Sequence, residues 1–480
     1  MSTHHDTLFL AGKFVPPHGD RTITVVSPST EEVIGSVPEA SPADVDVAVA
    51  AARAAFDDPS GWSSWEPAAR AEVLERFADE IDKRQEDILT AISSQNGMPI
   101  SIARRFEGGF SSLLLRYYAG LVRDQAPEER RPGMLVRETI VRRGPIGVVA
   151  AIVPWNVPQT LTFTKVAPAL AAGCSIVVKP SPETVLDAYV VAQAAQAAGL
   201  PAGVLSYVPG DRDLGAYLVS HPGVDKVAFT GSTAGGRAVA EACARLLRPV
   251  SLELGGKSAA IVLDDADLDL ATVGQSMFAA TLANNGQVCF LGTRVLAPRS
   301  RYAEVVDAFA AIMSSAPVGD ALDESTLIGP MASARQRDRV QEYIDLGVAS
   351  GARPVVGGGR AEGRGWFVQP TLFADVDNSD RIAQEEIFGP VLSVIPYDGD
   401  DEAVRIANAS SYGLGGTVWS TDPERALSVA GRVQTGTIGL NGYAPEPTAP
   451  FGGVKESGIG REFGPEGLAA YQQLKSIYVP

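Results

Sequence analysis

Apolar and polar residues follow each other along the chain with spacings that predict helices and strands. Residues 41–58 predict a helix that Ser41 caps, and Asp44 three residues later completes a capping-box pattern. Residues 66–92 predict a second helical stretch. Residues 134–155 alternate apolar with charged positions and then become wholly apolar. This change predicts an exposed β-ribbon that continues into a buried strand.

From residue 167 onward, short apolar strands alternate with helices. The strands are predicted at 175–179, 203–208, 226–231 and 249–254, with helices at 184–199, 213–221 and 234–247 between them. Such alternation is typical of a parallel, doubly wound sheet, whose ligands bind at the carboxyl ends of the strands. A second α/β region is predicted from about Gly255 to Gly453, and residues 469–480 form a β-prone tail able to pair with another chain.

Composition and charge narrow the class of protein. The length of 480 residues predicts two or three domains. The net charge of −17 disfavours a nucleic acid or an anionic membrane as partner. The first residues do not resemble a signal peptide, and the apolar run 146–155 is too short to span a bilayer. Three scattered cysteines, with no zinc-like spacing, favour a reducing cytoplasm and no bound metal.

Cys289 is the candidate nucleophile. It lies in the polar, glycine-containing segment NNGQVCFLGTR, whereas Cys174 and Cys243 lie in apolar or helical surroundings. Three of the four histidines lie near the N-terminus, and the fourth, His221, fits a surface turn. A cysteine hydrolase normally needs a histidine base, so this class is disfavoured. The thiol must be activated by local donors, and the base must be a carboxylate.

Glu253 is the candidate base, because its leucine neighbours at a strand end raise the pKa of a carboxyl group toward neutrality. A surface glutamate paired with a lysine is the alternative. Asn156 lies in the segment PWNVP, between Pro154 and Pro158, and a rigid amide at this point is suited to donate to an oxyanion.

Three further patterns are ambiguous by themselves. The Gly231–Ser232 turn joins a strand to a helix and fits either a phosphate-binding turn or an ordinary connection, and no GxGxxG motif occurs. Lys179 ends a strand, where it either contacts a ligand or is solvated. Phe388 and Phe451 lie in turn-rich segments and either line a pocket or fill the core.

Taken together, the segments PWN, FTGST, LELGGK, GQVC, EEIFGP and PFGGVKESGIGRE, in this order, resemble the aldehyde dehydrogenase superfamily over about residues 8–480. The resemblance implies an α/β, aldehyde dehydrogenase-like fold with a doubly wound cofactor domain at 1–125 and 144–254. It implies a catalytic domain at 255–453, and an oligomerisation ribbon and tail at 126–143 and 466–480. Members of the family form dimers or tetramers through this ribbon.

The resemblance also assigns roles to individual residues. Cys289 is the nucleophile, Glu253 the general base and Asn156 the oxyanion donor. Lys165 and Glu462 match the family's proton pathway. The expected cofactor contacts are Val153, Pro154, Trp155, Lys179, Ser181, Glu183, Gly231, Ser232, Leu254, Glu386 and Phe388. The expected substrate pocket consists of Val157, Val288, Phe290, Tyr443 and Phe451.

The predicted function is oxidation of an aldehyde to its carboxylic acid with NAD(P), through a cysteine thiohemiacetal and a thioester that water hydrolyses. The apolar and aromatic substrate positions favour apolar or aromatic aldehydes. NAD is the expected cofactor, with NADP possible, because Pro182 occupies the position of an acid found in many NAD-preferring relatives and Glu183 follows it. No arginine stands near these residues in the sequence.

Two alternatives remain. A CoA-acylating semialdehyde dehydrogenase generally lacks the base that Glu253 supplies, and a catalytically silent binding or structural homologue would not need the set of Cys289, Glu253 and Asn156. The cytoplasmic enzyme is expected to act as a homodimer or homotetramer on a small aldehyde, without nucleic acid or membrane.

Overall fold

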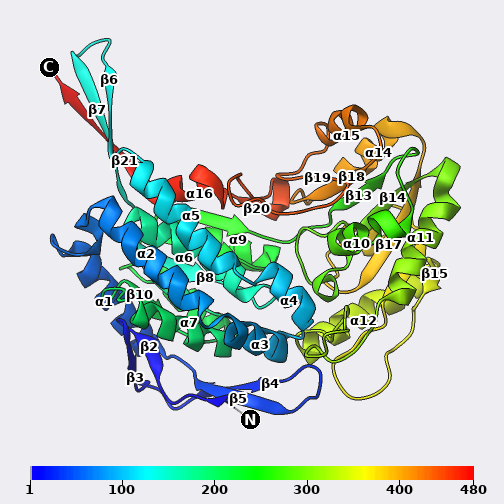
Figure 1. Ribbon diagram of the computed structural model, residues 1–480, viewed down its shortest axis with the longest axis horizontal. Coiled ribbons are helices and arrows are strands. Elements are labelled where there is room, and N and C mark those ends of the chain that lie inside the picture. Colours follow the sequence, from blue (N-terminus) through cyan, green and yellow to red (C-terminus); the bar gives the residue numbers. More distant parts are fainter. Residues whose placement is uncertain (1–2) are drawn as a thin grey trace.

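The computed structural model describes residues 3–480, and two large sheets with their covering helices dominate it (Figure 1). The six-stranded sheet has the order β10 (Leu205–Tyr207), β9 (Ser175–Lys179), β8 (Val148–Ile152), β11 (Lys226–Thr230), β12 (Val250–Glu253) and β20 (Gly458–Ile459). All strands except β20 run parallel. The predicted doubly wound α/β fold is confirmed.

Alternating residues of β8 enter two different cores. Val149 and Ala151 pack with the helices α6 (Pro158–Ala172) and α7 (Leu186–Ala197), whereas Val148 and Ala150 pack with α1 (Pro42–Asp57) and α8 (Arg212–Ser220). Because successive side chains of a strand point to opposite faces, a strand covered on both faces is apolar at every position. This burial explains the continuous apolar runs of β8 and β9.

The N-terminal helices partly match the prediction. Helix α1 begins after Ser41, whose hydroxyl and backbone pair with Asp44 in the predicted capping box. The stretch 66–92 is wrong as one helix, since it forms α2 (Pro67–Asp82) and α3 (Gln85–Asn96). The chain turns at Lys83 and Arg84, inside a run of six polar residues that provides no apolar anchor for a continuous helix. Helix α2 packs on α5 (Phe110–Asp124), and α3 packs on α7.

The second α/β region contains a seven-stranded sheet. Its order is β15 (Arg353–Val356), β16 (Thr371–Ala374), β17 (Val391–Tyr397), β14 (Arg294–Pro298), β13 (Ala259–Val262), β18 (Gly416–Trp419) and β19 (Gly439–Leu440). The helices around it are α10 (Leu270–Thr281), α11 (Tyr302–Ser315), α12 (Ala334–Ala349), α14 (Gly399–Asn408) and α15 (Pro423–Ala430). Figure 1 places this region beside the six-stranded sheet.

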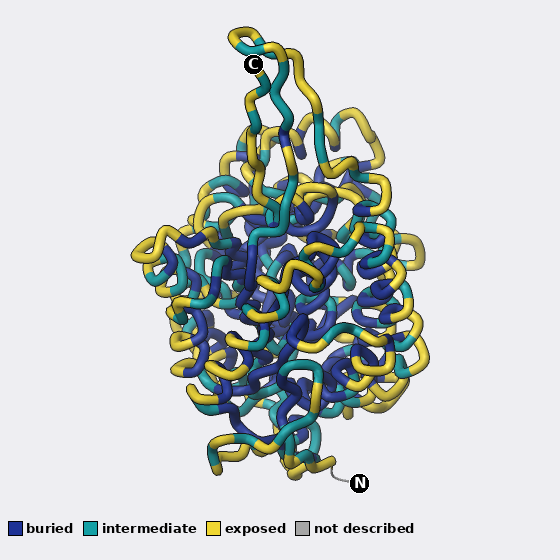
Figure 2. Tube along the Cα trace, turned by 90° about the vertical axis from the view of Figure 1, so that its left-hand side faces the viewer, coloured by how far each residue is buried: buried dark blue, intermediate teal, exposed yellow. Residues whose placement is uncertain are grey.

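A three-stranded ribbon projects from the body of the molecule (Figure 2). It consists of β6 (Glu128–Pro132), β7 (Glu138–Pro145) and the C-terminal β21 (Gln472–Val479), in the order β21-β7-β6. The tail therefore pairs antiparallel with β7 of its own chain. Met134 and Leu135 at the tip are fully exposed. The assignment of domain boundaries and of an oligomerisation role stays a prediction.

The N-terminal residues form small additional sheets. Strands β1 (Thr3–His4), β5 (Val33–Pro38) and β4 (Thr22–Val26) make one sheet, and β2 (Leu8–Leu10) pairs with β3 (Lys13–Val15) in a hairpin. Within residues 3–480, no helix is both long enough and apolar enough to cross a membrane.

Candidate active site

A cleft of about 830 Å³ lies at the carboxyl ends of the strands of the six-stranded sheet. The strand order reverses between β8 and β11, so the two connections leaving these strands diverge and open a crevice. The residues that line the cleft come from the ends of β8, β11 and β12, from α12 and from two later loops: Pro154, Trp155, Asn156, Leu161, Thr230, Gly231, Ser232, Leu254, Gly255, Cys289, Arg335, Gln336, Asp338, Arg339, Glu342, Glu386 and Phe388. The topology thereby brings together the separate sequence motifs.

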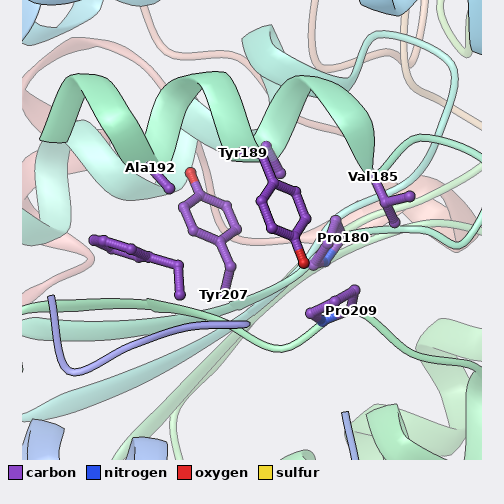
Figure 3. A pocket seen from close by; sticks show the side chains of 8 residues that line it. Pro180, Val185, Tyr189, Ala192, Tyr207 and Pro209 are labelled. Atoms are coloured by element: carbon purple, nitrogen blue, oxygen red, sulfur yellow. The ribbon is translucent and has the colours of Figure 1, made fainter. Parts of the chain in front are cut away.

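A second cavity lies under α7, between the rings of Tyr189 and Tyr207 and beside Pro180 and Pro209 (Figure 3). Its volume is about 10 Å³ and its lining is almost wholly apolar. A space of this size holds about one water molecule, so it cannot take a nucleotide. The large cleft is the site with room for a cofactor.

The turn before Cys289 is backbone-strained and held by amide side chains. Asn284, Asn285 and Gly286 all have positive φ values, of 51°, 61° and 73°. Asparagine tolerates this left-handed region better than most residues. The Asn285 amide donates to the carbonyls of Gly97 and Pro330, both at 2.9 Å, and its oxygen accepts from the Gly329 N–H at 2.6 Å. The asparagines therefore fix the turn that presents the nucleophile.

Two glycines after Glu253 allow the nucleophile and the Glu386 carboxylate to approach the backbone. A Cβ atom at Gly255 would lie 2.5 Å from the Glu386 carboxylate, and one at Gly256 would lie 2.2 Å from the Cys289 carbonyl oxygen. The Gly256 N–H donates to Glu386 at 2.9 Å. Any side chain at either position would push these loops apart.

Asn156 connects the end of β8 to the nucleophile turn. Its side-chain amide donates to the Gln287 carbonyl at 2.9 Å. Its own carbonyl accepts from the side chains of Asn284 at 2.9 Å and Asn96 at 3.3 Å. Gln287 is two residues before Cys289, and Asn156 and Cys289 line the same cleft, while the role of the amide as an oxyanion donor stays a prediction.

The thiol of Cys289 lines the cleft and is partly exposed. Burial first, and then the carboxylates of Glu386 and Glu253, raise its pKa. Cys174 is fully buried, and burial raises its pKa to about 11. Of the three thiols, Cys289 is the one that lines the cleft.

Glu253 is a buried carboxyl group. Its side chain sits at the end of β12 with 4% exposure, and within residues 3–480 neither carboxyl oxygen has a hydrogen-bond partner. Burial and the nearby Glu462 raise its pKa well above the ordinary value, while Lys165 and Arg461 act in the opposite direction. A carboxyl group with a raised pKa is a stronger base once it is ionised.

Lys165 and Glu462 form a buried ion pair beside Glu253. The distance from Lys165 Nζ to Glu462 Oε1 is 2.7 Å, and Nζ also donates to the Leu161 carbonyl at 3.1 Å and to the Thr164 hydroxyl at 3.2 Å. The family resemblance implies a proton pathway at these two residues. The structure places both against the proposed base, and the role stays a proposal.

The loop after β9 approaches α12 across the cleft. The Ser181 hydroxyl donates to Glu183 at 2.5 Å, and Arg335 Nη2 lies 3.8 Å from Glu183 Oε1. The expectation that no arginine is near holds along the sequence and is wrong in space, because α12 brings Arg335 from 152 positions away. Lys179 Nζ is buried and donates to the carbonyls of Pro180 and Gly210, and burial lowers its pKa to about 8.

The comparisons with known proteins agree over the whole chain. The sequence model of the aldehyde dehydrogenase family matches residues 14–477. A geranial dehydrogenase from Castellaniella defragrans is 58% identical over 480 residues, which is 100% of both chains. The chain belongs to the aldehyde dehydrogenase family. As a member of it, this enzyme oxidises an aldehyde with a nicotinamide cofactor.

Solved structures of other aldehyde dehydrogenases share the fold. The Mycobacterium tuberculosis enzyme, crystallised with NAD⁺, has a TM-score of 0.97 at 47% identity and covers 100% of this chain and 99% of its own. A cysteine-to-alanine variant of aldehyde dehydrogenase C from Pseudomonas syringae, crystallised with NAD⁺ and octanal, has a TM-score of 0.94 at 43% identity. Its match covers 98% of this chain and 96% of that chain.

The eleven expected cofactor contacts of this aldehyde dehydrogenase divide into seven that line the cleft and four, Val153, Lys179, Ser181 and Glu183, that do not. Seven of them line the cleft: Pro154, Trp155, Gly231, Ser232, Leu254, Glu386 and Phe388. Val153 is buried in the core, and Lys179 is turned toward backbone carbonyls. The rings of Trp155 and Phe388 meet edge to face at 5.4 Å. Burial raises the pKa of Glu386 to about 7.

Sequence reasoning missed all five polar residues of α12 that line the cleft, and two of them, Gln336 and Arg339, also hold a neighbouring loop. The Gln336 amide donates to the Phe388 carbonyl at 2.7 Å, and Arg339 donates to the Glu386 carbonyl at 2.8 Å. Both side chains thus hold the loop that carries Glu386 and Phe388. A signal was present in the sequence: three arginines occur within five residues of an acidic chain, a pattern suited to a cofactor diphosphate.

The expected substrate residues of this aldehyde dehydrogenase do not all line one cavity. The rings of Phe290 and Tyr443 stack at 4.3 Å, and Tyr443 shares a 2.5 Å hydrogen bond with Thr437. Tyr443 and Phe451 line a common cavity of about 220 Å³. Val157 is buried, and Val288 borders a separate small cavity beside Glu386. Leu161, which was not predicted, lines the cleft together with Cys289.

Proposed function

We propose that this aldehyde dehydrogenase oxidises apolar aldehydes of about the size of a monoterpene with NAD, and that it hydrolyses the acyl intermediate. The aromatic cavity at Tyr443, whose ring stacks on the residue that follows Cys289, carries the proposal on the substrate. Tyr443 and Phe451 line it, and Phe290 stacks on Tyr443. The relative that is 58% identical is named for geranial, a branched and unsaturated apolar aldehyde.

Tyr443 contributes mainly its aromatic ring, and not its hydroxyl, to the lining of this cavity. Its hydroxyl is committed to Thr437 at 2.5 Å and one ring face is covered by Phe290, so the part of the ring that lines the cavity offers apolar surface. Burying such surface against an apolar substrate contributes about 25 cal/mol per Å². The carboxylate Glu446 stands at the exposed rim and pairs with Thr448. Glu446 would repel an anionic aldehyde, and a cationic aldehyde would gain less from the apolar part of the lining than an alkenyl chain does.

The roles of the reacting groups follow from their placement. Ionised Glu253 takes the thiol proton of Cys289 and passes it toward Glu462 and Lys165, the sulfur adds to the aldehyde carbonyl, and the Asn156 amide donates to the oxyanion that forms. Bound NAD supplies the acceptor for the hydride that leaves the thiohemiacetal carbon. The resulting thioester stays on Cys289. Glu253 then removes a proton from water, which attacks the thioester and releases the acid.

The buried Glu253 supports hydrolysis over acyl transfer to coenzyme A. Its raised pKa and its position among Glu462, Lys165 and Arg461 suit a group that accepts a proton and passes it on. The ion pair of Lys165 and Glu462 leads from this carboxyl group into the buried hydrogen bonds of α6. A CoA-acylating enzyme has no use for such a base.

The preference for NAD rests on Glu183. Its carboxylate lies at the end of β9, where it can accept from ribose hydroxyls and repel the additional phosphate of NADP. Arg335 opposes this effect, because it is exposed by 88% and lies 3.8 Å from the same carboxylate. The preference for NAD is therefore modest.

We further propose that the enzyme is a cytoplasmic homodimer or homotetramer. The projecting ribbon of β6, β7 and β21 supports this assembly, because an exposed sheet edge and an exposed apolar tip at Met134 and Leu135 favour pairing with a second copy. Size-exclusion chromatography with light scattering tests it, and a monomer would contradict it.

A panel of aldehydes tests the substrate proposal. Geranial, citronellal, octanal and benzaldehyde are compared with betaine aldehyde and succinate semialdehyde by the rate of NADH formation. We expect kcat/KM to be highest for the branched apolar aldehydes and at least tenfold lower for the two charged compounds. A preference for either charged aldehyde would refute the apolar assignment. Release of an acyl-CoA when coenzyme A is added would refute hydrolysis.

A further inference from the structure

We propose that Asn96 is a positioning residue for the oxyanion hole, acting through the backbone that carries Asn156. The inference rests on the role proposed for Asn156 above. Asn96 is the last residue of α3 and is 1% exposed. It lies about sixty residues before Asn156, in a part of the chain that contributes no side chain to the lining of the cleft.

The Asn96 side chain uses both ends of its amide. Its Nδ2 donates to the carbonyl of Trp155 at 3.1 Å and to the carbonyl of Asn156 at 3.3 Å. Its Oδ1 accepts from the N–H of Met98 at 2.9 Å, across a turn at Gly97 that has a φ of 79°. The acceptor end therefore closes the turn after α3, and the donor end holds the two residues that place the oxyanion donor.

The residues on either side of Asn96 hold the neighbouring parts of the site. Gln95 accepts from the N–H groups of Val185 and Leu186, at 3.1 and 3.0 Å, where the Glu183 loop enters α7. The Gly97 carbonyl accepts from the Asn285 amide at 2.9 Å, in the turn before Cys289. Three consecutive residues thus hold the ribose-side loop, the oxyanion loop and the nucleophile turn.

This arrangement has a consequence for Asn156. Its carbonyl is held by Asn284 from the catalytic region and by Asn96 from the cofactor region. Without the Asn96 amide, the carbonyls of Trp155 and Asn156 lose their hydrogen bonds to α3. The two peptide groups then rotate more freely about the backbone. An oxyanion donor must be held within about 0.5 Å and 10–20° of its productive geometry. A small rotation of this loop would reduce the rate and leave cofactor binding intact.

The alternative is that Asn96 only closes the turn after α3. Two variants separate the two functions. Asn96→Ser retains an acceptor for the Met98 N–H in a short side-chain turn, but it is too short to reach the Trp155 and Asn156 carbonyls. Asn96→Ala removes both ends. Asn408→Ala is the matched control, because that amide also ends a helix and uses both of its ends on backbone groups, the Arg432 carbonyl and the Gln434 N–H, but does not line the cleft.

The experiment measures the hydride-transfer burst, kcat, KM for aldehyde, NAD affinity and the melting temperature. We expect kcat and the burst rate to fall about ten- to hundredfold in both Asn96 variants, with NAD affinity changed less than twofold. The melting temperature should fall more in Asn96→Ala than in Asn96→Ser. Asn408→Ala should lower the melting temperature and leave kcat within twofold.

A double-mutant cycle with Asn156→Ala completes the test. If Asn96 acts through Asn156, then Asn96→Ser in the Asn156→Ala background should slow the burst by less than about threefold. The inference would be overturned if Asn96→Ser slowed the burst in the Asn156→Ala background as much as it does alone. A normal kcat in the single variant Asn96→Ser would also overturn it. If Asn156→Ala itself kept its activity, the oxyanion assignment would fail instead, so the two failures are distinguishable.

Discussion

The side-chain amide of Asn156 donates a 2.9 Å hydrogen bond to the carbonyl of Gln287, two residues before Cys289. The bond joins the end of β8 to the nucleophile turn, across the boundary between the two large sheets. An asparagine amide has two N–H groups. One is committed to Gln287 and orients the amide plane, and the other is the donor that we assign to the oxyanion.

The first prediction concerns the nucleophile. Cys289→Ala should lower dehydrogenase activity below detection, because no other thiol lines the cleft among residues 3–480, and it should leave NAD affinity within about twofold. Isothermal titration and the NADH assay measure both effects. Cys243→Ser is the control and should remain active. Inactivation by iodoacetamide that follows labelling of Cys174 or Cys243 would contradict the assignment.

The second prediction concerns the base and its pH dependence. Glu253 has a raised pKa, and it works as a base only when ionised. Its ionised fraction grows as pH rises, so kcat should increase with pH beyond the ordinary range of a carboxyl group. Glu253→Gln should form the thioester once, accumulate the acyl adduct on Cys289 in mass spectra, and lose this increase. Normal turnover of the variant would rule Glu253 out as the base.

The third prediction concerns the buried ion pair. Lys165 and Glu462 are 0% and 6% exposed at the side chain and lie 2.7 Å apart. Lys165→Met leaves the Glu462 carboxylate unpaired next to Glu253, which should cost about 3–5 kcal/mol of unfolding free energy in urea titrations. The double variant Lys165→Met with Glu462→Leu should recover most of this loss. We expect deacylation in this double variant to remain at least tenfold slower than in the unmodified enzyme. A normal deacylation rate would argue against a proton pathway through the pair.

The fourth prediction concerns cofactor choice. Arg335→Gln should lower kcat/KM with NADP about tenfold, which is about 1.4 kcal/mol, and change the value for NAD less than threefold. The reason is that Arg335 is the cation beside Glu183 at the ribose end of the cleft. Arg337→Gln is the matched control, since Arg337 lies on the same helix and pairs with Asp338. Equal losses with both cofactors would show that Arg335 does not discriminate between them.

The sequence by itself determined the fold class and supplied the candidates for the reacting residues. Continuous apolar runs that alternate with helices predict a parallel sheet because both faces of such a sheet are buried, and β8 to β12 follow that pattern. Cys289, Glu253 and Asn156 were identifiable because each occurs in an unusual local setting: a thiol among amides, an acid among leucines, and an asparagine between prolines.

Only the tertiary structure decided which distant residues meet. Arg335 reaches Glu183, and Asn96 reaches Asn156, through helices whose sequence positions give no indication of their neighbours. The split of 66–92 into α2 and α3 likewise depends on which partner each helix buries its apolar face against. Local patterns reflect whether a residue is buried, whereas contacts across a cleft depend on how the strand order and the packed helices place segments in space.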